Sequence, residues 1–257
     1  YEEDKLEIAV LCLLGLVQGL CEFLPVSSSG HLVFLSSLFG VEDSLFVSII
    51  LHVATLLAVV IVFRKDVWQM VRHPLSEQAI NLYIATIPTC IIVLILLPLV
   101  DISFGGSFLA ICFLLSAILL IFSSRQAKKT PGQTFTKKHA IIMGIAQGFA
   151  VFPGLSRSGT TICAGLLCGG DKKECAKFSF LMSLPIIVLS LLMEIYNIAV
   201  ARQTVTVNTV GLLIAFIIAF VVGVLSIKVM IKLTEKANFK WFAIYLILLS
   251  IISLIVI

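Results

Sequence analysis

The sequence predicts an all-α integral membrane protein with six transmembrane helices and two re-entrant helical hairpins, arranged as an inverted-topology repeat. Three observations lead to this prediction. Of the 257 residues, 60% are hydrophobic and only 12% are charged, whereas soluble domains carry about 25% charged residues. The basic residues lie in short segments between apolar runs, and one polar motif occurs twice, half a chain apart.

Six apolar runs are long enough, or nearly so, to cross a bilayer core that takes roughly 20 helical residues. They are Leu45–Phe63, Ile80–Val100, Ser107–Ser123, Phe178–Val200, Val210–Val229 and Trp241–Ile257. Each run is therefore predicted to be one transmembrane helix.

Fifteen of the 18 Lys and Arg residues fall in four segments beside these runs, Arg64–Arg72, Arg125–Lys138, Lys172–Lys177 and Lys228–Lys240. Loops rich in Lys and Arg stay on the cytoplasmic side of a membrane. A nucleic-acid-binding patch is the alternative reading, but the clusters are short, dispersed and close to the ends of spans. We therefore expect no nucleic acid partner, and we expect the four segments to be cytoplasmic.

The internal repeat aligns Gly15–His31 with Gly144–Thr160 without gaps at an offset of 129 residues, and seven of the 17 positions are identical. We interpret residues 1–123 as a first repeat, with a hairpin at about 5–41 followed by three spans. A basic linker at 124–138 then leads to a second repeat at 139–257, with its hairpin at about 139–170. Such duplications are common in membrane proteins with a site near the bilayer midplane.

The charges that flank the two hairpins differ in sign. The second hairpin lies between the basic pairs Lys137–Lys138 and Lys172–Lys173, whereas the first lies between acidic residues at 2–4 and 42–43. The hairpins are therefore predicted to enter the membrane from opposite sides, the first from outside. Because irregular backbone at membrane depth must be buried in protein or line a wet cavity, the two loops are expected to meet in one polar chamber.

The first loop brings polar side chains into an apolar hairpin: Gln18, Glu22, Ser27, Ser28, Ser29 and His31. Gln18 and Glu22 are four residues apart and so share one helix face. A glutamate within the membrane is expensive and marks a functional site by default. The alternatives are a solvated Glu22 at the membrane surface and a His31 that is satisfied within the core.

The second loop carries Arg157 as the one cation between Ala140 and Gly170. The guanidinium group matches phosphate geometry in a bidentate fork. The residues expected to help it bind an anion are Gly154, Ser156, Ser158, Gly159 and Thr161. A helix that begins near Ser158 would also direct its N-terminal N–H groups at that anion. The alternative for Arg157 is a structural role on the carbonyl groups at a helix C-terminus.

Together the loops predict an anion cradle that faces a carboxylate and a histidine. This combination suits phosphoryl transfer, which depends mainly on positioning and charge neutralisation. It also suits a divalent metal held between Glu22 and a diphosphate.

These residues resemble the bacterial undecaprenyl-diphosphate phosphatase family, also called the bacitracin-resistance protein family. Its first motif is Glu or Gln, three residues, Glu, Phe-Leu-Pro and a serine-rich stretch ending in Gly-His, as in Gln18–His31. Its second motif, Pro-Gly-x-Ser-Arg-Ser-x-x-Thr, matches Pro153–Thr161 without a mismatch. The resemblance continues through Ala176–Leu181 and Phe242–Tyr245, and so covers nearly the whole chain.

The resemblance implies removal of the terminal phosphate of undecaprenyl diphosphate, which recycles the lipid carrier for cell-wall synthesis and confers bacitracin resistance. By motif position it makes Glu22, Ser28, His31 and Arg157 the catalytic set. His31 or Ser28 would be the nucleophile, or His31 the acid–base partner of Ser28, and the sequence leaves this open. It also implies Mg²⁺ or Ca²⁺ on Glu22, although Gln18 stands where a second carboxylate is common.

The expected location is the bacterial cytoplasmic (inner) membrane, with the active site facing outside. Membrane lipids and a polyprenyl diphosphate are the expected partners, and a homodimer is compatible with this prediction. Type-2 phosphatidic-acid phosphatases share a Ser-Gly-His and a Ser-Arg, but they need a later histidine, and none follows Arg157.

The rival hypotheses are a transporter or flippase of a phosphorylated polyprenyl lipid and, more weakly, a small-anion channel. The pair Glu22 and His31 distinguishes an enzyme from both, because anion binding alone needs no reactive group.

Overall fold

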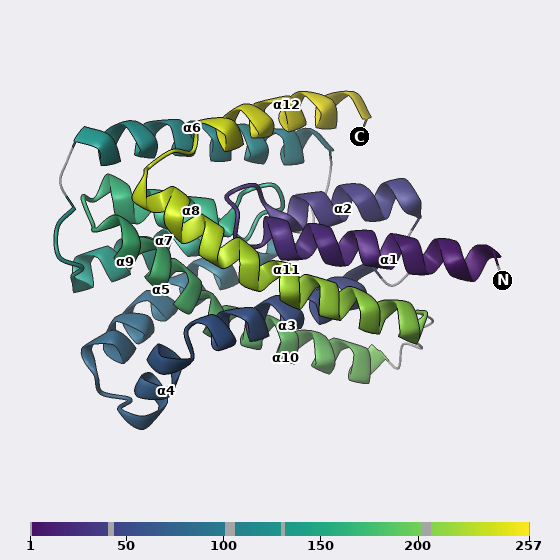
Figure 1. Ribbon diagram of the computed structural model, residues 1–257, viewed down its shortest axis with the longest axis horizontal. Coiled ribbons are helices and arrows are strands. Elements are labelled where there is room, and N and C mark those ends of the chain that lie inside the picture. The colour runs from purple at the N-terminus through teal and green to yellow at the C-terminus, as the bar shows by residue number, and fades with distance from the viewer. Residues whose placement is uncertain (1, 41–43, 101–105, 130–131, 202–206, 257) are drawn as a thin grey trace.

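The computed structural model describes residues 2–40, 44–100, 106–129, 132–201 and 207–256, which form helices α1 to α12 (Figure 1). The helices are α1 Glu2–Cys21, α2 Ser28–Phe39, α3 Ser44–Val62, α4 Arg64–Arg72, α5 Glu77–Val100, α6 Gly106–Lys129, α7 Lys137–Phe149, α8 Arg157–Leu167, α9 Lys172–Leu181, α10 Ser183–Ala201, α11 Thr209–Glu235 and α12 Lys240–Val256. The one β pairing among these residues is an isolated bridge between Gln133 and Gly170.

Four segments in the described ranges are long and apolar enough to cross a membrane: Glu77–Val100, Phe108–Lys129, Lys172–Met193 and Thr209–Glu235. A fifth candidate is α3 together with α4, which bends away from it by 83°. The run predicted from Trp241 onward lies in α12, an apolar helix of lesser length. The chain is thus a multi-pass helical protein, and the count of six spans stays a prediction.

The helix ends refine the predicted segments. The run at 178–200 is divided, because α9 ends at Leu181 and α10 begins at Ser183. In contrast, α5 continues through Pro88 and Pro98. α6 runs on to Lys129, into the residues interpreted as the linker. The division into two repeats and a linker stays a prediction.

Each hairpin packs along a helix from the other half of the chain: α1 lies along α11, and α7 lies along α5. Both contacts depend on a glycine. A Cβ atom on Gly15 would overlap the carbonyl oxygen of Ala215, and one on Gly144 would overlap that of Ala85. The backbones approach closely at these points, as small residues allow in membrane helix pairs.

The hairpins lie toward opposite ends of the molecule, with their turns meeting in the middle (Figure 1). At one side α6 and α12 form an antiparallel pair.

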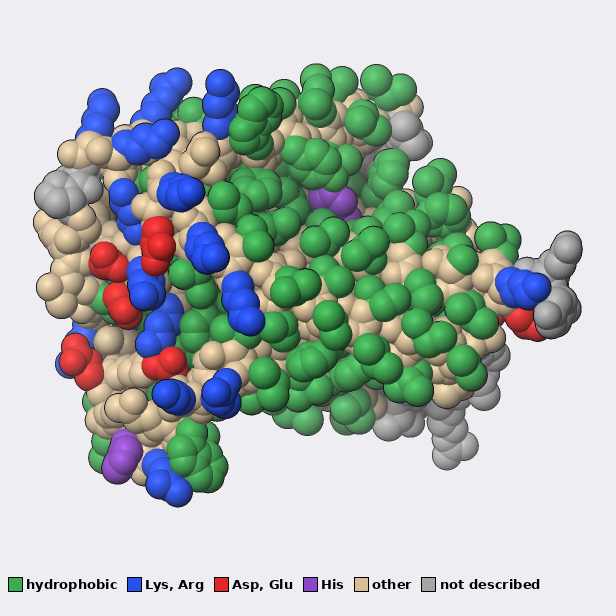
Figure 2. All heavy atoms as spheres, in the orientation of Figure 1, with side chains coloured by type: hydrophobic (Ala, Val, Ile, Leu, Met, Phe, Trp, Pro, Cys, Tyr) green, Lys and Arg blue, Asp and Glu red, His purple; other side chains and the backbone are tan. Residues whose placement is uncertain are grey.

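The surface has two zones. Figure 2 shows hydrophobic side chains over most of the visible face and Lys and Arg gathered at the end that holds α4, α9 and the C-terminus of α6. Large apolar side chains such as Leu94, Ile95 and Leu213 are more than half exposed. Apolar surface on this scale is not found on soluble monomers. The fold is therefore that of an all-α integral membrane protein, as predicted.

Candidate active site

The two hairpin turns start their second helices with the same capping contact. Ser27 precedes α2, and its Oγ accepts a hydrogen bond from the N–H of Gly30. Ser156 precedes α8, and its Oγ accepts one from the N–H of Gly159. Such caps satisfy N–H groups that a helix start leaves unpaired. Ser27 differs in having a φ of 68°, a strained conformation that is often found at functional sites.

A cavity of about 370 Å³ lies between the turns. Of the predicted site residues, those that line it are Glu22, Ser27, Ser28, Ser29, Ser156 and Arg157. Other parts of the hairpins and the helices α3, α5, α7 and α10 supply the rest of its wall. The chamber predicted between the loops is thus present in the structure.

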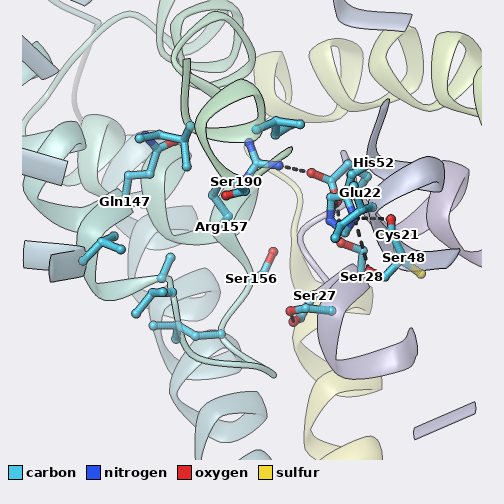
Figure 3. A pocket seen from close by; sticks show the side chains of 18 of the residues that line it. Cys21, Glu22, Ser27, Ser28, Ser48, His52, Gln147, Ser156, Arg157 and Ser190 are labelled. Carbon is cyan, nitrogen blue, oxygen red and sulfur yellow. Dashed lines mark hydrogen bonds and ion pairs between the residues drawn. The ribbon is translucent and has the colours of Figure 1, made fainter. Parts of the chain in front are cut away.

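Glu22 is the centre of this site. Its carboxylate is buried, with 5% of the residue exposed. Oε2 accepts hydrogen bonds from Ser28 Oγ at 2.5 Å and from Gln18 Nε2 at 3.1 Å. Oε1 forms an ion pair with Arg157. Figure 3 shows the Arg157 side chain reaching from the second hairpin toward Glu22 of the first. A buried charge pair of this kind satisfies both partners, and it joins the two halves of the chain.

The short Ser28–Glu22 contact is a hydroxyl-to-carboxylate hydrogen bond, which is shorter and stronger than a neutral one. The hydrogen bond directs the hydroxyl proton of Ser28 at the carboxylate of Glu22, which could accept it. This pairing is the arrangement by which a general base activates a serine nucleophile.

His31 lies outside this cavity lining. Its Nδ1 donates a hydrogen bond to the backbone oxygen of Ser27 at 2.7 Å, so the neutral ring can accept at Nε2 from the hydroxyl of Tyr245 at 2.5 Å. The imidazole also stacks on the Tyr245 ring and meets the edge of Phe113. The structure thus brings Glu22, Ser28 and Arg157 together, while it places His31 against α12.

The remaining predicted residues hold the turns rather than line the cavity. Ser158 donates a hydrogen bond from the second hairpin to the backbone oxygen of Leu24 in the first. Thr161 donates to the backbone oxygen of Arg157 and contacts Ser179. Gly154, with a φ of 88°, and Gly159 let backbone approach Leu109 and Pro25 closely.

One residue of the cavity wall was missed in the sequence. His52 of α3 lines the cavity, and its Nε2 lies 3.5 Å from Glu22 Oε2. Its Nδ1 donates to the backbone oxygen of Ser48 at 2.7 Å. Ser48, His52 and Thr55 are spaced by four and three residues, which places them on one helix face. This polar stripe within an apolar span was the signal that could have identified it.

Gln147, the repeat counterpart of Gln18, also lines the cavity. Gln147 Nε2 donates to the backbone oxygen of Met182 at 3.3 Å and to Thr89 Oγ1 at 3.4 Å. Gln18 Nε2 likewise donates to Thr55 Oγ1 at 3.3 Å. Each amide therefore ties its hairpin to a neighbouring helix.

The donor set of the site suits a metal that is shared with a substrate, not a metal held by protein alone. No group of three or more His, Cys, Asp or Glu side chains in the described residues is arranged to hold an ion. Glu22 is the one carboxylate in the described cavity wall. However, Gln18 Oε1 beside it is buried without a hydrogen-bond partner. Mg²⁺ commonly binds through one or two carboxylates together with substrate phosphates, and these oxygens fit that mode.

Comparison with known proteins shows the family of this chain. The family model for the bacitracin resistance protein BacA matches residues 11–252. An undecaprenyl-diphosphatase of Bacteroides fragilis is 38% identical over 95% of this chain and 96% of its own length. Proteins of the same name from Methanosphaera stadtmanae and Thermosipho melanesiensis are each 36% identical, over 97% and 95% of this chain and 98% and 97% of their own lengths. The resemblance seen in the two motifs is confirmed, and the chain belongs to the bacitracin resistance protein BacA family.

Proposed function

We propose that this protein hydrolyses undecaprenyl diphosphate to undecaprenyl phosphate and inorganic phosphate. The observation that carries this proposal is the carboxylate of Glu22, which is bound at once to the Ser28 hydroxyl and to the Arg157 guanidinium inside a polar cavity. A base, a nucleophile and a phosphate-binding cation thus stand within one hydrogen-bonded unit. The names of the relatives agree with this activity, and no observation favours the transporter alternative.

In this proposal Glu22 takes the proton of Ser28 as Oγ attacks the terminal phosphorus. The bond from that phosphorus to the bridging oxygen breaks, and undecaprenyl phosphate leaves. Glu22 passes this proton to the departing phosphate. It then takes a proton from the water that attacks the phosphorus on Ser28, and it returns that proton to Ser28 Oγ as inorganic phosphate leaves. Arg157 stabilises the charge on the phosphoryl oxygens, the main task in such transfers. Ser28 is preferred to His31 as nucleophile because Ser28 alone lines the cavity and contacts Glu22.

The catalytic role of His31 stays a prediction. Its hydrogen bond to the Ser27 backbone oxygen supports a role in holding the serine turn. Direct action on substrate would require its ring to leave Tyr245.

A divalent cation, Mg²⁺ or Ca²⁺, is proposed to be held by Glu22 and the unpartnered Gln18 Oε1 together with the phosphates. When bound it would neutralise charge on the diphosphate. Ser27, Ser29, Ser156 and the α8 N-terminus are proposed to contact the same group. Ser158, Thr161 and the two glycines would support that contact indirectly.

The proposed topology is an inverted repeat with six spans in the bacterial cytoplasmic membrane and an active site open to the outside. The opposed hairpins, the paired glycine contacts of Gly15 and Gly144, and the basic residues gathered at one end (Figures 1 and 2) support it. Removal of exposed undecaprenyl diphosphate would confer bacitracin resistance. Homodimer formation stays a prediction.

The test is phosphate release from a polyprenyl diphosphate by the purified chain, with Mg²⁺, with Ca²⁺ and with a chelator. We expect release that falls when the chelator is added and returns with the metal. Lipid binding without release under all metal conditions would reject the enzyme and favour transport. Phosphate release that the chelator does not affect would reject the role of the metal but not the hydrolysis.

A further inference from the structure

A second cavity, with no wall residue from the hairpin turns, lies between α6 and α12 at the basic end of the molecule. It measures about 340 Å³ and has two kinds of wall residue. The cations and one hydroxyl are Arg125, Lys128, Lys240 and Ser124, and the apolar residues are Ile121, Ala243, Ile244 and Ile247. In Figure 2 the Lys and Arg side chains at this end of the α6–α12 pair border directly on hydrophobic side chains.

The helix registers explain why the cavity has a charged end and an apolar end. On α6 the lining positions 121, 124, 125 and 128 follow the three- and four-residue spacing of one helix face. On α12 the positions 240, 243, 244 and 247 repeat that spacing. Because α6 ends where α12 begins, Lys128 and Lys240 fall at the same end of the groove, and Ile121 and Ile247 lie deeper. The graded polarity matches a phospholipid, which has an anionic head and apolar chains.

The charge of this cavity is not balanced by the protein. In the described parts of the chain, Arg125, Lys128 and Lys240 form no ion pair, and no acidic side chain lines the cavity. Ser124 Oγ accepts a hydrogen bond from the N–H of Phe239, which leaves its own proton for another acceptor.

A neighbouring cavity at the same end provides a contrast. It measures about 460 Å³, and its lining includes Glu77, Asp171 and Glu174 beside Lys177. Lys177 is itself paired with Asp66 at 2.6 Å. The α6–α12 cavity is therefore distinctive in its positive charge, not merely in being near the basic end.

The groove is also bordered by side chains that are typical of a membrane surface. Trp241 follows Lys240 and is 72% exposed, and tryptophan is enriched where membrane meets water. Phe122 and Leu248 are more than half exposed on the same pair of helices. Basic pockets between membrane helices on the cytoplasmic side commonly hold anionic lipid head groups. We propose that the α6–α12 groove is a binding site for an anionic phospholipid, separate from the site of hydrolysis.

The experiment uses the full chain in nanodiscs with Trp68→Phe, which leaves Trp241 as the one tryptophan. Brominated phosphatidylglycerol or brominated phosphatidylcholine is mixed with the unbrominated lipid, and quenching of Trp241 fluorescence gives the relative affinity. We expect phosphatidylglycerol to be preferred by about fivefold for each cation that contacts its phosphate. Arg125→Gln with Lys240→Gln should lower the preference about 25-fold and leave about the fivefold that Lys128 contributes.

The matched control is Lys228→Gln with Lys232→Gln, which removes the same charge from exposed positions of α11 outside the cavity. It should keep the preference, and phosphate release should be unchanged in both pairs. If the first pair does not fold, Lys128→Gln alone should lower the preference about fivefold. Equal quenching by the two lipids in the parent chain would overturn the proposal. An equal loss in the control pair, or competition by inorganic phosphate in solution, would overturn it too.

Discussion

The turn between α1 and α2 and the turn between α7 and α8 share a serine cap, yet they carry different reactive groups. When the two copies of the motif are aligned, Glu22 corresponds to Val151, Ser28 to Arg157, and His31 to Thr160. The first turn supplies the buried carboxylate and the hydroxyl bound to it, and the second supplies the guanidinium. The shared serines thus cap the second helix of each hairpin, and the groups that carry the proposed chemistry fall where the two turns differ.

This division is tested most strongly by Arg157→Ala. Loss of the guanidinium removes the charge that stabilises the transferring phosphoryl group, and we expect kcat/KM to fall about 10³-fold or more. Arg157→Lys keeps a charge but loses the bidentate fork, so its activity should lie between that of the unaltered protein and that of the alanine variant. The measurement is phosphate release at varied substrate concentration. Near-normal activity in the alanine variant would remove the second turn from catalysis.

One serine from each turn, Ser28 and Ser156, allows a direct comparison of the turns. Ser28→Ala removes the proposed nucleophile and should lower kcat about 10³-fold. Ser156→Ala removes a helix cap and should cost about 1 kcal/mol of stability with a much smaller effect on kcat. Thermal unfolding in detergent, measured beside turnover, separates these outcomes. Similar kinetic losses in both variants would contradict the division of roles.

Glu22→Gln keeps the shape of the side chain but removes the base and leaves Arg157 without its partner. We expect a fall in kcat of about 10²- to 10⁴-fold, the range of general base catalysis. The matched change is Gln18→Glu, which adds a carboxylate beside Glu22 and should be tolerated. If Gln18→Glu is inactive, the amide itself is required.

His52→Leu should lower kcat/KM about tenfold, because it removes a ring whose Nε2 lies 3.5 Å from Glu22 Oε2. The change leaves the proposed nucleophile in place. His52→Gln retains a hydrogen-bonding group and should restore most of the loss. Equal loss in both variants would mean that only the imidazole serves, as expected of direct proton transfer.

The smallest kinetic effects are expected at Gly15 of α1 and Gly144 of α7, where the two hairpins are alike. An alanine at either position must push two backbones apart, which typically costs about 1–3 kcal/mol. Unfolding midpoints should fall by similar amounts in the two variants. A large difference between them would show that the hairpins are not packed equivalently.

The sequence was informative wherever a pattern is local. Apolar runs predicted α3, α5 and α11, and the two motifs predicted Glu22, Ser28 and Arg157 as neighbours in one chamber. In contrast, the break at Met182 follows from no strong local signal, since α5 accepts two prolines without ending.

The positions of the two histidines were also beyond local reading. The ring of His31 is oriented by Tyr245, which lies 214 residues away, and its direction cannot be read from the motif alone. His52 was overlooked because it belongs to a span outside both motifs.

The glycine contacts also bear on the order in which the protein is assembled. Gly144 meets Ala85, a residue that the ribosome has already made when α7 emerges, so the second hairpin can dock as it is synthesised. Gly15 meets Ala215, which is made only when most of the chain is complete. The first hairpin, which carries the glutamate that is unfavourable in lipid, therefore stays without its packing partner until α11 is made. Because each half supplies the docking helix of the other, the second hairpin finds its helix already made, whereas the first cannot be completed before the second half is synthesised.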